Sequence, residues 1–186
     1  MSKLFFVCVT MKLFIFQNAL ANDPYVDIST TMCREEEDVY ISCAFNSGSD
    51  QYSYGGEVAS ICAKSNTSPD DGYVQYRYGT PTYGNKSEKI KMQYPEKKLP
   101  PKGIFTIYKS NNPESAGIAL RFKSGAYVYS FENVGILNYR VVVRKHETIV
   151  FDKACTLPGK NYLIDKAYIG IQHIEFDQKK ISATHK

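Results

Sequence analysis

The chain has 186 residues, with 23 Lys and Arg against 19 Asp and Glu and a formal net charge of +4. A charge so nearly balanced argues against a nucleic-acid-binding protein, which usually carries a concentrated basic face. The length suits one domain that is large enough to bury a core without a metal ion.

The N-terminus has the pattern of an export signal. Lys3 gives a positive start, an apolar run from Leu4 to Phe16 follows, and residues 19–21 have the small-x-small pattern that signal peptidase cleaves. The run is too short, and too interrupted by Thr10 and Lys12, to span a membrane. The alternative is a buried N-terminal strand or a retained anchor.

These features predict the domain organisation. We expect a signal peptide at 1–21, a single β domain at 22–178 and a polar tail at 179–186. Cleavage lowers the Lys and Arg count from 23 to 21, against 19 Asp and Glu. The mature protein is then periplasmic or secreted, with no transmembrane anchor and no nucleic-acid partner.

Four cysteines remain after cleavage: Cys33, Cys43, Cys62 and Cys155. An even number in an exported chain favours disulfides, and all three pairings stay open. Joining Cys155 to any other cysteine closes a loop of over ninety residues, which removes roughly 4–5 kcal/mol of unfolded-state entropy. A zinc site is not expected, because no Cys-x-x-Cys pair occurs and no His lies near the first three cysteines.

Period-two alternation dominates the rest of the chain and predicts strands with one buried and one solvated side. It places Val39 on the same face as Cys43, and Ile90 on the same face as Met92. The alternating segments are 39–45, 57–63, 73–79, 88–94, 103–108, 116–122, 126–131, 139–144 and 148–154. Turn-forming residues separate them, so we expect an all-β fold, an antiparallel sandwich or barrel of about eight to nine strands. A short helix from Tyr162 to Tyr168 and a strand from Ile169 to Phe176 are expected after them.

Candidate catalytic residues are few. The only histidines are His146, in a charged turn between two strands, His173 and His185. No motif supplies a nucleophile with a base and an orienting group, and the acidic run REEED (34–38) is typical of a solvated turn. We therefore expect a protein that is not an enzyme and has no cofactor.

Two other patterns are open to more than one interpretation. Residues 86–102 hold six Lys against two Glu, which suits an anionic envelope polymer but fits better with a strand edge kept soluble. NTS (66–68) and NKS (85–87) match the N-glycosylation sequon, which matters only in a host that glycosylates exported proteins.

The segment RFKSGAYVYSF (121–131) contains two alternating runs that meet at Ser124-Gly125. A Ser-Gly pair between strands is an ordinary two-residue turn, and it would join 116–123 to 126–131. On this interpretation Ser124 and Tyr127 are turn and strand residues without a further role.

The frame of the chain resembles small exported four-Cys β-proteins of Gram-negative bacteria. The likeness covers roughly residues 31–157. Its motifs are, in chain order, a first Cys, a second Cys in VYISC, SICA, YVQYRYG, a YP turn, a Gly-flanked aromatic hairpin, and the Cys that ends VVVRKHETIVFDKAC.

A second likeness is to periplasmic lysozyme inhibitors, which insert a loop with a Ser-Gly-x-Tyr motif into the enzyme's cleft. Ser124, Gly125 and Tyr127 match that motif in SGAY. The resemblance implies that Ser124 hydrogen-bonds a catalytic acid, Gly125 allows close backbone approach and Tyr127 supplies contact area. It predicts an inhibitor or immunity protein against a cell-wall hydrolase. The alternative is an envelope protein that binds a glycan or a protein through an aromatic face, which would include Tyr73, Tyr76, Tyr78 and Tyr83.

Overall fold

The computed structural model describes residues 27–45, 56–81, 88–110, 117–133, 139–156 and 162–176. The predicted signal peptide at 1–21 and the polar tail at 179–186 lie outside these residues and stay predictions. The described part of the chain contains no candidate membrane-spanning helix.

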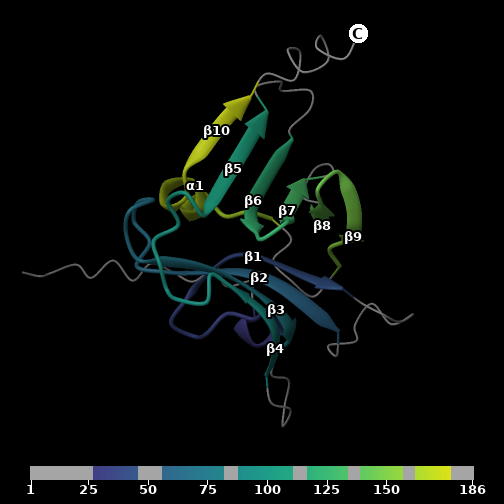
Figure 1. Cartoon of the computed structure of the whole chain (residues 1–186). Helices are drawn as coiled ribbons and strands as arrows, with labels where there is room; N and C mark the ends of the chain where they lie inside the picture. The colour runs from purple at the N-terminus through teal and green to yellow at the C-terminus, as the bar shows by residue number, and fades with distance from the viewer. Residues whose placement is uncertain are drawn as a thin grey trace, which may run out of the picture.

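Ten strands in the described residues form two sheets, and the strands of one cross those of the other (Figure 1). The first sheet has the antiparallel order β1-β2-β3-β4, with bounds Asp38–Phe45, Glu57–Lys64, Tyr73–Thr80 and Lys89–Tyr94. The second has the order β10-β5-β6-β7-β8-β9. Its strands are β5 (Phe105–Ser110), β6 (Ile118–Ser124), β7 (Tyr127–Asn133), β8 (Tyr139–Lys145), β9 (Thr148–Ala154) and β10 (His173–Phe176).

The predicted all-β class is confirmed, as a sandwich-like fold and not a closed barrel. Each of the nine predicted strands is present with slightly shifted ends, and β10 pairs parallel with β5 while the other pairs are antiparallel. The expected C-terminal helix is α1 (Asp165–Gly170), which begins three residues later than predicted. A short 3-10 helix, η1 (Ile28–Thr30), precedes β1.

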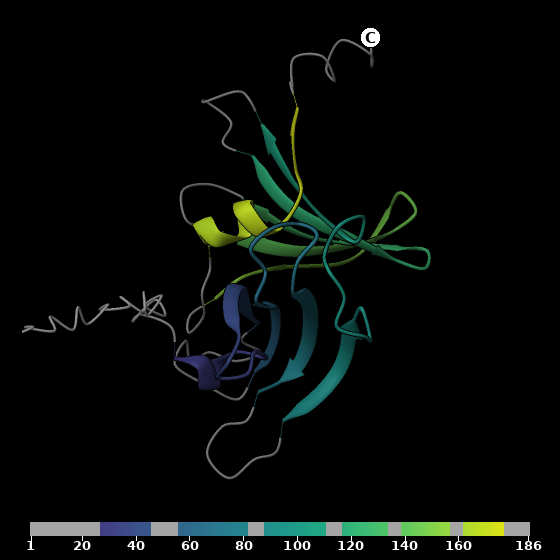
Figure 2. The same cartoon turned by 90° about the vertical axis from the view of Figure 1, so that its left-hand side faces the viewer.

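The main core lies between the inner faces of the two sheets. Ile61 and Val74 in the first sheet and Phe105, Leu120 and Phe131 in the second are all buried there. Helix α1 closes one end of this core, because Ala167 on the helix belongs to the same cluster. Figure 2 shows the two sheets from the side, with α1 at one edge of the space between them.

Two β-bulges correct the predicted faces. An extra residue in β1 between Val39 and Ile41 turns Val39 to the outer face, where it packs on Cys33 and Cys62. A second bulge between β3 and β4 places Ile90 opposite Gly79, so Ile90 is 40% exposed instead of facing the core with Met92. A strict period of two fails wherever a strand carries one extra residue.

The two disulfides resolve the open pairing. Cys33–Cys62 fastens the segment before β1 to the outer face of β2, and Cys43–Cys155 joins β1 to the end of β9 across the two sheets. Thr156 also makes a bridge to Ala44, so β1 and the chain after β9 lie side by side. The loop between Cys43 and Cys155 spans 112 residues, and its closure contributes roughly 4–5 kcal/mol in the chain-entropy account.

The sequon asparagine Asn66 is part of the fold. Its side-chain amide donates to the carbonyls of Ser68, Asp71 and Gly170, and its oxygen accepts from Tyr40. Gly170 must be glycine for this contact, since a Cβ there would lie 1.8 Å from the Asn66 oxygen. A glycan on Asn66 would disrupt this packing. The NKS match (85–87) falls within residues 82–87, which are outside the described part of the chain.

Candidate functional site

Strand β3 contributes to two different regions because its side chains alternate between the faces of the sheet. Tyr73 and Arg77 point to the outer face, whereas Tyr76 and Tyr78 point into the space between the sheets. The prediction that these tyrosines form one aromatic face is therefore wrong for Tyr73, because its side chain is on the other face of the sheet from Tyr76 and Tyr78. Tyr83 lies outside the described residues.

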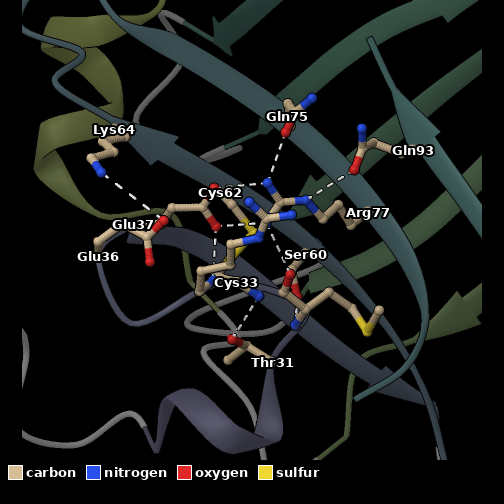
Figure 3. Close-up of polar contacts among 12 residues, drawn as sticks. Thr31, Cys33, Glu36, Glu37, Ser60, Cys62, Lys64, Gln75, Arg77 and Gln93 are labelled. Atoms are coloured by element: carbon tan, nitrogen blue, oxygen red, sulfur yellow. Dashed lines mark hydrogen bonds and ion pairs between the residues drawn. A yellow bond between two sulfur atoms is a disulfide. The ribbon is translucent and has the colours of Figure 1, made fainter. Parts of the chain in front are cut away.

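The outer face carries a buried polar network centred on Arg77, shown in Figure 3. The Arg77 guanidinium makes a bidentate ion pair with Glu37, with N–O distances of 2.6 and 2.7 Å, and both side chains are almost fully buried. It also donates to Gln75 at 2.7 Å, to Gln93 at 3.4 Å and to the Met32 carbonyl at 3.1 Å. We call Glu37, Tyr73, Gln75, Arg77 and Gln93 the Arg77 cluster.

Glu37 is equally well satisfied. It accepts a hydrogen bond from the Tyr73 hydroxyl at 2.7 Å and from the Arg34 backbone N–H at 2.8 Å. Burial alone would raise its pKa, but the hydrogen bonds from Arg77, Arg34 and Tyr73 together hold the pKa below the ordinary value of 4.5. Burial and the bond to Glu37 raise the Tyr73 pKa to about 12.

The interpretation of REEED as a solvated turn is therefore wrong at Glu37, although Arg34, Glu35 and Glu36 are exposed. The only sequence signal for this was a lone arginine in an otherwise uncharged strand forty residues further on. The sulfur atoms of Cys33 and Cys62 lie close to a Glu37 oxygen. Because the two sulfurs are bonded to each other, they cannot serve as thiolate ligands. The Arg77 cluster therefore has the properties of a structural element that holds residues 27–37 on the sheet.

The space between the sheets opens at one end into a cavity of about 360 Å³, which we call the aromatic pocket. Its lining combines rings and aliphatic side chains from both sheets. The lining residues are Phe45, Tyr76, Tyr78, Lys91, Met92, Tyr127, Tyr129, Val141, Val143, Val150 and Phe151.

The pocket has a buried floor and an exposed mouth. Tyr76 is only 3% exposed, whereas Tyr127 and Val150 are 36% and 52% exposed. Burial raises the pKa of the Tyr76 and Tyr78 hydroxyls, and in each case a neighbouring phenol or carboxylate raises it further. Both tyrosines therefore stay neutral over the physiological range.

Charged side chains lie at the mouth. Glu57 accepts hydrogen bonds from the Tyr78 hydroxyl and from Lys91. The ammonium of Lys145 lies 5.6 Å from the centre of the Tyr127 ring, and that of Lys153 lies 5.6 Å from the Phe151 ring. Such cation–π contacts hold the two lysines beside the opening.

The SGAY hairpin lies beside this mouth. Its turn is shifted by one residue from the predicted position. The two loop residues are Gly125 and Ala126, not Ser124 and Gly125, because Ser124 pairs with Tyr127 as the last rung of the β6–β7 ladder. Gly125 has φ of +59°, a conformation that glycine adopts without strain at the first position of a tight turn. Ser124 and Tyr127 therefore share the face that is turned toward the pocket.

The β8–β9 turn lies next to this hairpin, and its His146 N–H donates to the Ala126 carbonyl at 3.4 Å. We call Gly125–Ala126 and His146–Glu147 the paired tips; Figure 2 shows them together at one end of the six-stranded sheet. His146 lies in the predicted turn, and His173 begins β10. Within the described ranges, neither histidine forms a hydrogen bond or ion pair with a carboxylate.

Comparison with known protein families, with curated proteins and with solved structures finds no match.

Proposed function

We propose that this protein is exported, to the periplasm or out of the cell, and acts by binding a lysozyme-like cell-wall hydrolase without catalysing a reaction. The observation that carries the proposal is the pair of adjoining tips with Ser124 and Tyr127 beside them. Two disulfides support an oxidising compartment, where such bonds persist.

The geometry of the tips suits insertion into a cleft. The β6–β7 ladder continues to Ser124 and Tyr127, and the neighbouring turn braces the loop, so little ordering entropy is lost on binding. Tyr127 remains 36% exposed, so its ring and hydroxyl are available to a partner. A lysozyme cleft contains one protonated and one ionised carboxyl group, which a serine hydroxyl and a phenol can both engage.

The alternative target, a glycan bound through aromatic rings, has less support. Sugars require several hydrogen-bonding groups beside the stacking ring. The pocket lining is mostly apolar, and the Tyr78 hydroxyl is already bonded to Glu57. The Lys-rich strand β4 is an edge strand of the first sheet, in agreement with a solubilising role for its lysines.

The test is inhibition of purified lysozymes of different classes, and of amidases, by the mature protein. Micromolar protein should inhibit at least one enzyme, and Ser124→Ala and Tyr127→Phe should each weaken inhibition about tenfold with little change in Tm. Tyr108→Phe, a half-buried tyrosine on β5, is the matched control and should inhibit normally. If no hydrolase loses activity, the proposal is wrong.

A further inference from the structure

We propose that the aromatic pocket is a separate ligand site, which binds a small aromatic carboxylate that carries a second hydrogen-bonding group. A volume of about 360 Å³ is within the range of small-molecule sites in proteins. The inference does not depend on hydrolase binding, although Tyr127 contributes to both surfaces.

The walls of the pocket favour a flat apolar body. Six of its lining residues are aromatic, and they come from both sheets. Phe45 meets Phe151 edge-on at 5.4 Å, and Tyr76 lies tilted against Tyr129 at 5.7 Å. A planar ring placed among tilted rings gains edge and face contacts beyond the burial of its area.

The floor offers a hydroxyl group that has no hydrogen-bond partner among the described residues. Tyr76 is 3% exposed, yet its hydroxyl makes no hydrogen bond to any residue that the structure describes. The rings of Tyr78 and Tyr129 line the same pocket, and the Tyr129 ring lies 5.7 Å from that of Tyr76. This hydroxyl is not among the buried polar atoms that lack a partner in the described residues, so its oxygen reaches the space of the pocket that Tyr76 lines. A polar atom on a ligand would give it a hydrogen bond there.

The mouth selects for negative charge. Lys91 is already paired with Glu57. Lys145 and Lys153, in contrast, form no ion pair with the described residues and lie only over rings that line the pocket. Glu57 also interacts electrostatically with Lys153, so three ammonium groups share one carboxylate at the entrance. The excess positive charge attracts a carboxylate and repels a cation.

These three features fix the orientation of the ligand. Its carboxylate lies at the mouth near Lys145 and Lys153, its ring lies between Phe45, Phe151 and the tyrosines, and its second polar group reaches Tyr76. The compound 6-hydroxy-2-naphthoate has this arrangement and serves as the probe. 2-Naphthoate lacks the hydroxyl group, and 2-naphthol lacks the carboxylate.

Calorimetric titration of the mature protein with these probes tests the site. We expect saturable binding of 6-hydroxy-2-naphthoate, about fivefold tighter than 2-naphthoate because of one hydrogen bond, and weaker binding of 2-naphthol. Lys145→Glu and Lys153→Glu, both at exposed positions, should each weaken binding of the two carboxylates about five- to tenfold. Lys97→Glu, an exposed lysine that does not line the pocket, is the matched control and should leave binding unchanged.

Tyr76→Phe tests the floor separately. It should abolish the preference for 6-hydroxy-2-naphthoate over 2-naphthoate while 2-naphthoate still binds, a result that a general loss of folding would not give. Three outcomes would overturn the proposal: no saturable binding, equal binding of carboxylates by Lys153→Glu and Lys97→Glu, or tighter binding of decanoate than of the naphthoates. Hydrolase inhibition is not a readout here, so this site and the paired tips can fail independently.

Discussion

The Arg77 cluster and the aromatic pocket lie on opposite faces of strand β3, and their polar groups differ in how many hydrogen-bond partners they have. On the outer face, Arg77 and Glu37 are fully buried, and each is hydrogen-bonded to several partners. On the inner face, the Tyr76 side chain is almost fully buried but its hydroxyl has no hydrogen-bond partner among the described residues, and the lysines at the mouth lie over rings. A site whose donors are all used stabilises the fold, whereas one with unused donors can accept a ligand.

The difference comes from what covers each face. Residues 27–37 lie over the outer face, held there by the Cys33–Cys62 disulfide and by the Arg77–Glu37 pair. Charges buried in this way are tolerated only when they are paired. The pocket mouth, with Val150 at 52% exposure, remains open in the described part of the chain.

The largest expected effect tests the structural role of the Arg77 cluster. Arg77→Met leaves Glu37 buried without its ion-pair partner, and it should lower the free energy of unfolding by roughly 3–5 kcal/mol. Adding Glu37→Leu should recover much of this loss, because the unpaired charge is removed. Urea unfolding measures both.

The matched control is Lys102→Met, which removes an ion pair with Asp70. The side chains of Lys102 and Asp70 are 63% and 65% exposed. This substitution should lower the free energy of unfolding by less than about 1 kcal/mol. If Arg77→Met costs no more than Lys102→Met, the cluster does not hold the outer face.

The pH dependence of stability should also depend on Glu37. Its pKa is lowered in the folded protein, so the unfolded chain takes up the proton more readily. The stabilisation is therefore complete above the ordinary value of 4.5 and is lost as the pH falls through the lowered pKa. Unfolding measured from pH 7 to pH 2 should show this loss, and Glu37→Gln should make the curve flatter below pH 4.5. An unchanged acid limb in Glu37→Gln would assign the loss to other carboxylates, such as Glu132, whose pKa is also lowered because bonds from Arg144 and Ser130 outweigh burial.

The smallest expected changes in stability come from two tyrosines of strand β3, one on each face of the sheet. Tyr73→Phe removes a hydrogen bond to the buried Glu37 carboxylate and should cost roughly 1.5–3 kcal/mol. Tyr76→Phe removes a hydroxyl that has no partner among the described residues, so stability should change by less than about 0.5 kcal/mol. Urea unfolding of both variants gives the comparison. A larger loss in Tyr76→Phe would mean that the pocket floor is structural.

Much of the fold could be predicted from sequence, because alternation and turn residues act over short distances. All nine predicted strands are present, and the C-terminal helix and strand occur close to their expected positions. Prediction was wrong where one extra residue altered the register, as at Val39 and Ile90, and where the hairpin turn shifted by one residue to Gly125–Ala126. A bulge depends on the partner strand, which a local pattern does not contain.

The candidate sites were predicted only in part. Tyr76, Tyr78 and Tyr127 were identified as candidate binding residues, and the structure brings all three to one pocket. The mouth lysines Lys145 and Lys153 were missed, since nothing in the sequence indicates that two neighbouring strands present them beside the same rings.

Residue type and spacing were enough to predict that this protein is built from short strands and that the four cysteines after residue 21 can form cross-links. Tertiary structure alone decided which cysteines pair, that Glu37 is buried against an arginine forty residues away, and that rings from two sheets enclose a pocket. Those outcomes depend on strand register and on which chain segment covers each face. Both are set by packing between residues that are distant in sequence.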